Sequence, residues 1–140
     1  MLRQRLGMAA GAAILLAGSA ATAVAHHSFS AEFDASKPIN LDGVVVEFRW
    51  VNPHSLLIVD AEKEDGTVER WEILGGAPSP LLRRGWTKDS LPPGTRVTVS
   101  GSQAKDGSLR ASGGTIRFPD GTSMNFGSTG IGAAPGSEND

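Results

Sequence analysis

Residues 43–60, with the sequence GVVVEFRWVNPHSLLIVD, constrain the fold of this chain more than any other stretch. Two runs rich in β-branched and apolar residues flank Asn52-Pro53-His54. Pro53 lacks the backbone N–H that a sheet ladder needs, so it is expected between strands rather than within one. We therefore predict a first strand from about Ile39 to Val51 with a bend near Gly43, a turn, and a second strand over residues 54–60.

Alternation divides the first strand into two faces, because successive side chains of a strand point in opposite directions. The predicted inward face carries Val44, Val46, Phe48 and Trp50, and the other carries Val45, Glu47, Arg49 and Val51. The second strand is almost wholly apolar, which is typical of a strand buried on both faces or curled inside a small barrel.

Turn signals divide the rest of the chain into short elements. The Asp-Gly pairs at 65–66, 106–107 and 120–121 favour tight turns between strands. We expect further strands over 67–74, 95–102 and 109–118, and a short one that ends at 126. Residues 79–85 predict a helix: Ser79 can cap its first amides, Pro80 suits its first position and Gly85 its left-handed stop.

The predicted fold is all-β, a small OB-fold-like five-stranded barrel with one short helix between strands 3 and 4. Trp71 and Ile73 face inward in the third strand of this arrangement, as do Val97 and Val99 in the fourth. The alternative is a small β-sandwich, which has no particular use for a helix at that place.

The first 25 residues predict an export signal. Arg3 and Arg5 precede an Ala/Leu/Gly-rich apolar run, and residues 23–25 have the small-x-small form that signal peptidase recognises. We expect cleavage after Ala25 and a periplasmic or secreted protein with no membrane span after processing. The alternative is an uncleaved anchor. The predicted organisation is a signal peptide at 1–25, a domain with an N-terminal arm at 26–127, and a disordered tail rich in Gly, Ser and Ala at 128–140.

Composition excludes several classes of function. The chain carries 13 basic and 15 acidic residues, and its basic residues are scattered except for Arg83-Arg84, so nucleic acid is not an expected partner. The absence of cysteine excludes disulfides and thiolate chemistry. Neither a G-x-S-x-G signature nor a phosphate-binding glycine loop is present, which favours a protein without enzymatic activity.

The turn between the first two strands is the candidate ligand site. We predict that Trp50, Asn52 and His54, together with Trp71, bind a small ligand or a periplasmic protein. For His54 the alternative is a structural role, in which its ring bonds the backbone near Pro53. For the tryptophans the alternative is a place in the core.

A copper site is the second hypothesis. Cleavage after Ala25 would make His26 the N-terminal residue, and its amine and imidazole together can chelate copper(II). His27 or His54 would supply a third nitrogen. The alternative is a flexible arm without metal. The predicted function is thus an exported, non-enzymatic binding or accessory domain of unknown ligand, and the alternative is a copper(II)-binding protein.

Three motifs carry a family resemblance: His26-His27-Ser28-Phe29, Trp50 with Asn52-Pro53-His54, and residues 81–86. Together they resemble a family of small exported proteobacterial proteins that is catalogued as a domain of unknown function (DUF 6152 type). The likeness covers nearly the whole mature chain. It implies an exported single domain, and it brings no reaction, cofactor or catalytic residue.

Overall fold

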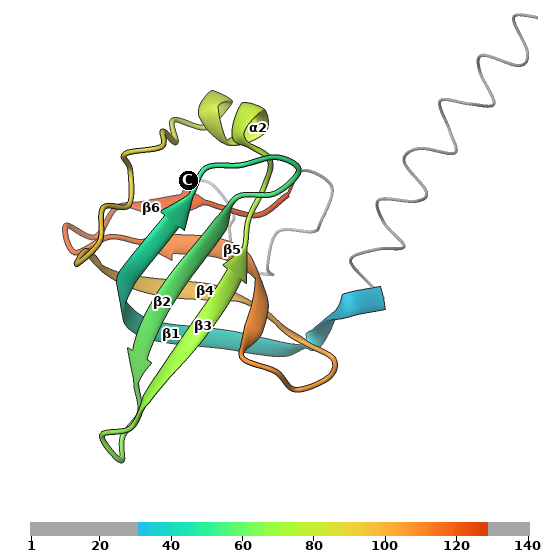
Figure 1. Ribbon diagram of the computed structural model, residues 1–140, viewed down its shortest axis with the longest axis vertical. Helices are drawn as coiled ribbons and strands as arrows, with labels where there is room; N and C mark the ends of the chain where they lie inside the picture. Colours follow the sequence, from blue (N-terminus) through green and yellow to red (C-terminus); the bar gives the residue numbers. More distant parts are fainter. Residues whose placement is uncertain (1–30, 129–140) are drawn as a thin grey trace, which may run out of the picture. The chain divides into compact units, whose positions relative to one another are not determined.

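The computed structural model describes residues 31–128, and over this range the predicted all-β class is confirmed (Figure 1). The elements follow in the order β1 (Phe33–Arg49), β2 (Leu56–Glu62), β3 (Val68–Leu74), α2 (Pro78–Arg83), β4 (Arg96–Ala104), β5 (Arg110–Arg117) and β6 (Ser123–Asn125). The predictions for the signal peptide, for His26 and His27 and for nearly all of the tail fall outside these residues.

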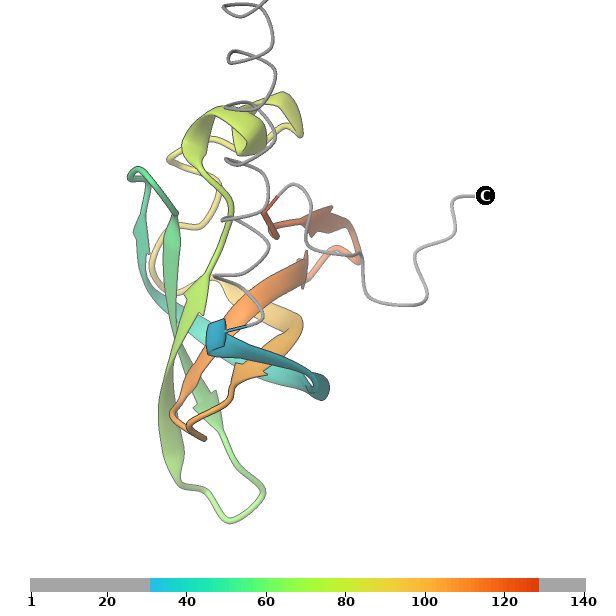
Figure 2. The ribbon, with the colours of Figure 1, turned by 90° about the vertical axis from the view of Figure 1, so that its right-hand side faces the viewer.

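The strands form one sheet in the order β3-β2-β1-β4-β5-β6. One additional pairing is parallel and joins Glu72–Leu74 of β3 to Arg110–Ser112 of β5. The pairings therefore lead from β1 through β2, β3, β5 and β4 back to β1. The helix α2 follows β3 and lies at one end of the strands in both views (Figures 1 and 2).

The long strand β1 serves two neighbours. Its residues 38–44 pair with β4 and its residues 43–49 pair with β2, so the strand changes partner at Gly43. A Cβ at Gly43 would lie 2.6 Å from Val59 Cγ1 and 2.7 Å from the Asp60 carbonyl oxygen. The close approach of β2 therefore requires glycine here. Figure 1 shows β1 turning between its two halves, in agreement with the expected bend.

The predicted faces of β1 are wrong at Val44 and Val45. Val45 is 2% exposed and belongs to the core, although alternation placed it outward with Glu47. Val44 was predicted to face inward, but it is only half-buried and is not part of the core. The register with β2 shifts between Val45 and Glu47, and an extra residue in such a bulge reverses the alternation. Beyond the bulge the prediction is correct, since Phe48 and Trp50 pack against the core and Glu47 is exposed.

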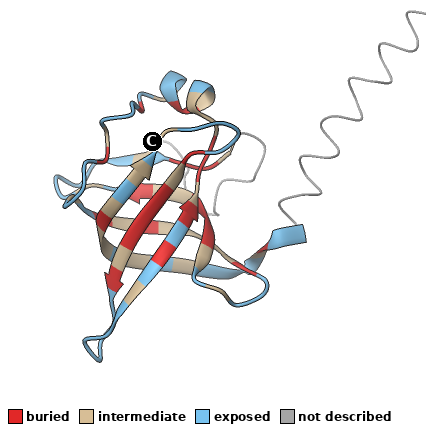
Figure 3. Ribbon diagram, viewed as in Figure 1, coloured by how far each residue is buried: buried red, intermediate tan, exposed pale blue. Residues whose placement is uncertain are grey.

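Buried residues of the five long strands and of the α2 region make up the core, and Figure 3 marks buried residues along the ribbon in red. Trp71 and Ile73 of β3 face inward as predicted, and so do Val97 and Val99 of β4. Residues 57–59 of β2 are all buried, which confirms the strand expected to be buried on both faces. The complete buried cluster is Val45, Leu57, Val59, Ala61, Trp71, Ile73, Leu81, Trp86, Leu91, Val97, Val99, Ala111, Ile116 and Phe126.

The helix α2 begins one residue earlier than predicted, at Pro78. Ala77 occupies its N-cap and no side chain caps it, so the predicted cap at Ser79 is wrong. The Ser79 hydroxyl lies inside the helix and accepts a hydrogen bond from Arg83 Nη1 at 3.2 Å. The predicted stop is confirmed, because Gly85 has a φ of +90°.

The segment after α2 connects the helix to the last strand. Trp86 is fully buried, and its Nε1 donates a hydrogen bond to the Asn125 carbonyl oxygen at 2.8 Å. Arg84 Nη1 donates to the Gly127 carbonyl oxygen at 2.6 Å and to Asn125 Oδ1 at 3.0 Å. Leu82, by contrast, is 60% exposed. Arg84 and Trp86 therefore hold residues 125–127 against the helix end of the domain.

Candidate functional site

The turn at residues 50–55 joins β1 to β2 at the end of the sheet that carries α2 (Figure 1). Its Asn52-Pro53 peptide bond is cis. Ser55 N donates a hydrogen bond to the Gly76 carbonyl oxygen at 2.9 Å, and Gly75 N donates to the Ser55 carbonyl oxygen at 2.8 Å. The exit of the turn is therefore fixed to the segment that follows β3.

His54 is exposed, and its ring is also fixed to that segment. Its Nδ1 lies 3.2 Å from the carbonyl oxygen of Gly75. A carbonyl oxygen only accepts, so this hydrogen bond places the ring proton on Nδ1. The ring does bond the backbone, but to a residue distant in sequence rather than near Pro53. In this tautomer Nε2 carries a lone pair that is open to a ligand.

Trp50 and Asn52 contribute further polar groups to the turn. Trp50 is half-buried and packs edge-on against Phe48, with ring centroids 5.7 Å apart. Within residues 31–128, neither the Trp50 indole N–H nor the Asn52 side-chain amide has a hydrogen-bond partner. With His54 Nε2, the turn thus presents three uncommitted polar groups beside an aromatic surface.

Trp71 lies apart from this turn. It is 5% exposed, belongs to the core, and pairs with Val59 in the middle of β3. Its Nε1 donates to Glu69 Oε2 at 3.2 Å. It lies three positions before Leu74, the last residue of β3, which corresponds to about 10 Å along a strand. The structure brings Trp50, Asn52 and His54 together and places Trp71 in the core.

Of the three proposed copper ligands, one lies within the described residues. His26 and His27 lie outside the described residues, and His54 is the one histidine inside them. Across residues 31–128 no group of three His, Cys, Asp or Glu side chains is placed to hold a metal ion. The copper hypothesis therefore stays a prediction that depends on the N-terminal segment.

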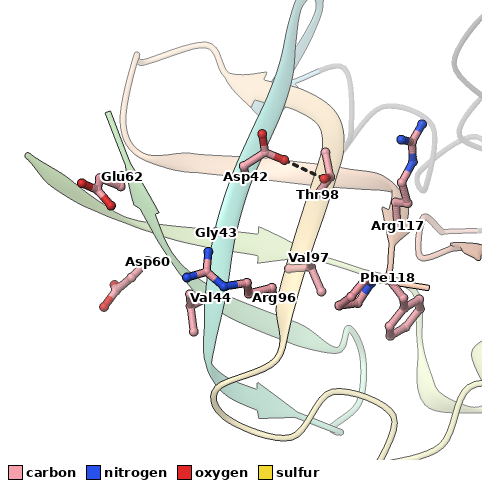
Figure 4. Close-up of a pocket in the computed structure, with 11 residues that line it drawn as sticks. Asp42, Gly43, Val44, Asp60, Glu62, Arg96, Val97, Thr98, Arg117 and Phe118 are labelled. Carbon is pink, nitrogen blue, oxygen red and sulfur yellow. Dashed lines mark hydrogen bonds between the residues drawn. The ribbon is translucent and has the colours of Figure 1, made fainter. Parts of the chain in front are cut away.

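A second candidate site is a groove of about 550 Å³ on the outer face of the sheet, which we call the outer groove (Figure 4). Residues 42–44 of β1, Asp60 and Glu62 of β2, and residues 96–98 of β4 line it, together with residues 117–119 at the end of β5. The sequence alone does not reveal this site, because its residues come from four strands. Their outward positions were the available signal, but only the strand order shows that these strands are neighbours.

Charged side chains dominate the outer groove. Asp42 Oδ1 accepts a hydrogen bond from Thr98 Oγ1 at 2.6 Å. Asp60 accepts two from the Arg70 guanidinium, at 2.7 and 2.8 Å, and these hydrogen bonds hold the pKa of Asp60 below its usual range. Arg96 and Arg117, by contrast, form no ion pair with any described carboxylate. The groove thus offers two unused guanidinium groups.

Ser55, at the exit of the turn, was also missed. Its side chain is fully buried, and its Oγ has no hydrogen-bond partner among the described residues. A buried hydroxyl without a partner is costly, so Ser55 is a point of reduced stability next to His54. Nothing in the sequence distinguishes it from the exposed serines of the turns.

These features define a small all-β protein with an exposed polar turn at one end and a charged groove on its outer face. The chain belongs to the Family of unknown function (DUF6152), whose model matches residues 13–114. No curated protein and no solved structure matches it. No helix within residues 31–128 is long and apolar enough to cross a membrane.

Proposed function

We propose that this protein is an exported, non-enzymatic binding domain, and that the turn at residues 50–55 binds a small ligand or a periplasmic protein. The observation that carries the proposal is the set of uncommitted polar groups on Trp50, Asn52 and His54. A turn whose exit is already fixed loses little conformational freedom when it binds, which favours affinity. Tryptophan is also the residue type most enriched among energetically dominant contacts of interfaces.

The proposed architecture is an OB-fold-like barrel. The closed circuit of strand pairings supports it, as does the position of α2 between β3 and β4 in the chain. In OB-folds the loop between strands 1 and 2 takes part in ligand binding, and here that loop is the turn at residues 50–55. The role of this turn in binding is thus inferred by analogy with that fold.

Thermal unfolding in the presence of defined compounds tests the binding proposal. Amino acids, monosaccharides, dicarboxylates and nucleosides serve as the panel, and the expected result is a raised Tm with at least one class. Asn52→Ala and His54→Ala should each abolish the shift. Glu64→Ala, in the loop between β2 and β3, is the matched surface control and should keep it. If no class raises Tm, or if His54→Ala leaves the shift unchanged, the turn is not the binding element.

The alternative function is copper(II) binding, and the hydrogen bond from His54 Nδ1 to Gly75 favours it. Metal-binding histidines commonly donate their second ring N–H to a carbonyl, which orients the free nitrogen. The amine and the imidazole of an N-terminal His26 would then bind copper(II) together with a third nitrogen. That third nitrogen would be His54 Nε2 or a ring nitrogen of His27. Mass spectrometry of the exported protein gives the first test, because a chain that begins elsewhere lacks the bidentate ligand.

Copper(II) titration gives the second test. A chain that begins at His26 should show a visible d–d absorption band, and acetylation of its N-terminus should abolish that band. His54→Ala distinguishes the two candidates for the third ligand. A band that moves in this variant assigns the role to His54, and an unchanged band assigns it to His27.

A further inference from the structure

The outer groove is a second candidate site, and its residues are distinct from those of the turn at residues 50–55. The strand register aligns its outward side chains in a row, since Thr98 pairs with Asp42 on one side and with Arg117 on the other. Gly43 pairs with Ala61, and continuing that register by one residue sets Glu62 beside Asp42. The row crosses β2, β1, β4 and β5, so it spans three strand spacings, about 14 Å.

The two ends of this row carry opposite charge. Glu62 stands at the β2 end and Arg117 at the β5 end, and neither forms an ion pair with another described residue. Figure 4 shows them at opposite sides of the groove, with Arg96 lying over Val44 between them. A purely anionic ligand would face the carboxylates of Asp42, Asp60 and Glu62, although Asp60 is already paired with Arg70. A purely cationic ligand would face the guanidinium groups of Arg96 and Arg117.

The middle of the groove offers both kinds of hydrogen-bonding group. Asp42 uses one carboxylate oxygen for the Thr98 hydroxyl, and its Oδ2 remains as an acceptor. Arg96 supplies donors that no described carboxylate uses. A peptide backbone presents donors and acceptors in alternation, and free peptide termini carry opposite charges.

We propose that the outer groove binds a short extended peptide with free termini. Its ammonium group lies toward Glu62 and its carboxylate at Arg117, while Asp42 accepts from a backbone N–H and Arg96 donates to a carbonyl oxygen. Four residues at about 3.4 Å each span about 14 Å, which matches the row. The groove volume of about 550 Å³ lies within the usual range for small-ligand sites.

Amide NMR spectra of the isotope-labelled protein, titrated with tetra-alanine, test this proposal. Recognition rests on the termini and the backbone, so this peptide is a sufficient ligand. Titration to about 10 mM should shift the amides of Asp42, Thr98 and Arg117, with a dissociation constant in the millimolar range or below. N-acetylated tetra-alanine and its C-terminal amide should each bind about tenfold more weakly. No shift at the highest concentration, or equal affinity for all three peptides, would overturn the proposal.

Two variants assign the orientation. Arg117→Gln should weaken binding of the free and the acetylated peptides and leave the amide unaffected, because that peptide has no carboxylate to lose. Glu62→Gln should weaken binding of the free peptide and the amide and leave the acetylated peptide unaffected. Arg49→Gln, a change at an exposed arginine paired with Glu47, is the control and should match the unaltered protein. Any other pattern contradicts the assigned orientation. Shifts confined to residues 50–55 would contradict the groove and leave the proposed role of the turn intact.

Discussion

Replacement of Ser55 by alanine should stabilise the protein. The Ser55 hydroxyl is fully buried without a partner, and such a group costs about 1–3 kcal/mol. Alanine removes the hydroxyl and keeps both backbone hydrogen bonds that Ser55 makes with Gly75 and Gly76. It also loses the packing of one buried atom, which lowers the gain. We therefore expect the free energy of unfolding to rise by about 1 kcal/mol, or Tm by about 4–8 °C for a domain of this size.

The matched control is Ser100→Ala. The Ser100 hydroxyl accepts a hydrogen bond from Thr115 N at 3.2 Å and donates to the Thr115 carbonyl oxygen at 3.3 Å. Its removal should lower the free energy of unfolding by about 1 kcal/mol. Urea denaturation of both variants measures the difference between a hydroxyl with partners and one without. A Ser55→Ala variant that is less stable than the parent protein would refute the reasoning, because it would show that this hydroxyl is satisfied.

Three further predictions concern packing and pH. Gly43→Ala should lower the free energy of unfolding by about 1–3 kcal/mol, because the new Cβ would overlap Val59 and the Asp60 carbonyl. Urea denaturation measures this loss, and an unchanged midpoint would show that β1 and β2 can separate there at no cost. Trp86→Phe should cost about 2–4 kcal/mol, since it leaves a cavity and removes the hydrogen bond to Asn125; a loss below about 1 kcal/mol in the same assay would contradict this. Acid should destabilise the protein. The pKa is lowered for the carboxyls of Asp34, Asp65, Asp106 and Asp120, in each case first by the side-chain hydroxyl and then by the backbone N–H of the Ser or Thr two residues on. A carboxyl whose pKa is lowered by folding contributes stability above its unfolded pKa of about 4, and that stability is lost as the pH falls through its folded pKa. Urea midpoints should therefore fall as the pH is lowered below about 4, and a flat profile would contradict the assignment.

Local signals were sufficient to predict most elements of the fold. Asp-Gly pairs located the turns after β2, β4 and β5, and alternation correctly placed Trp71 and Ile73 inward. The predicted orientation of Val45 was wrong, because the bulge depends on how β1 pairs with β2. The pattern of apolar and polar residues in β1 alone does not indicate it. It failed at Ser79 because Pro78 already begins the helix, which moves the cap to Ala77.

The two candidate sites also differ in whether the sequence could predict them. Trp50, Asn52 and His54 are close in sequence, so a local pattern was enough to find them. The outer groove requires knowing that β4 lies beside β1 and that β5 lies beside β4. The isolation of the Ser55 hydroxyl likewise follows from three-dimensional packing, which no local pattern encodes.

The contacts of residues 125–127 with Arg84 and Trp86 decide how far the chain can be shortened. A protein cut after Ser128 keeps the carbonyl oxygens of Asn125 and Gly127, and both side chains retain their acceptors. A protein cut after Met124 leaves a buried indole N–H and a guanidinium without them, and it also loses Phe126 from the core. Expression trials should therefore give soluble protein when the chain ends at residue 128 and insoluble protein when it ends at residue 124. This limit is set by Arg84 and Trp86, which lie about forty positions earlier in the chain than their acceptors.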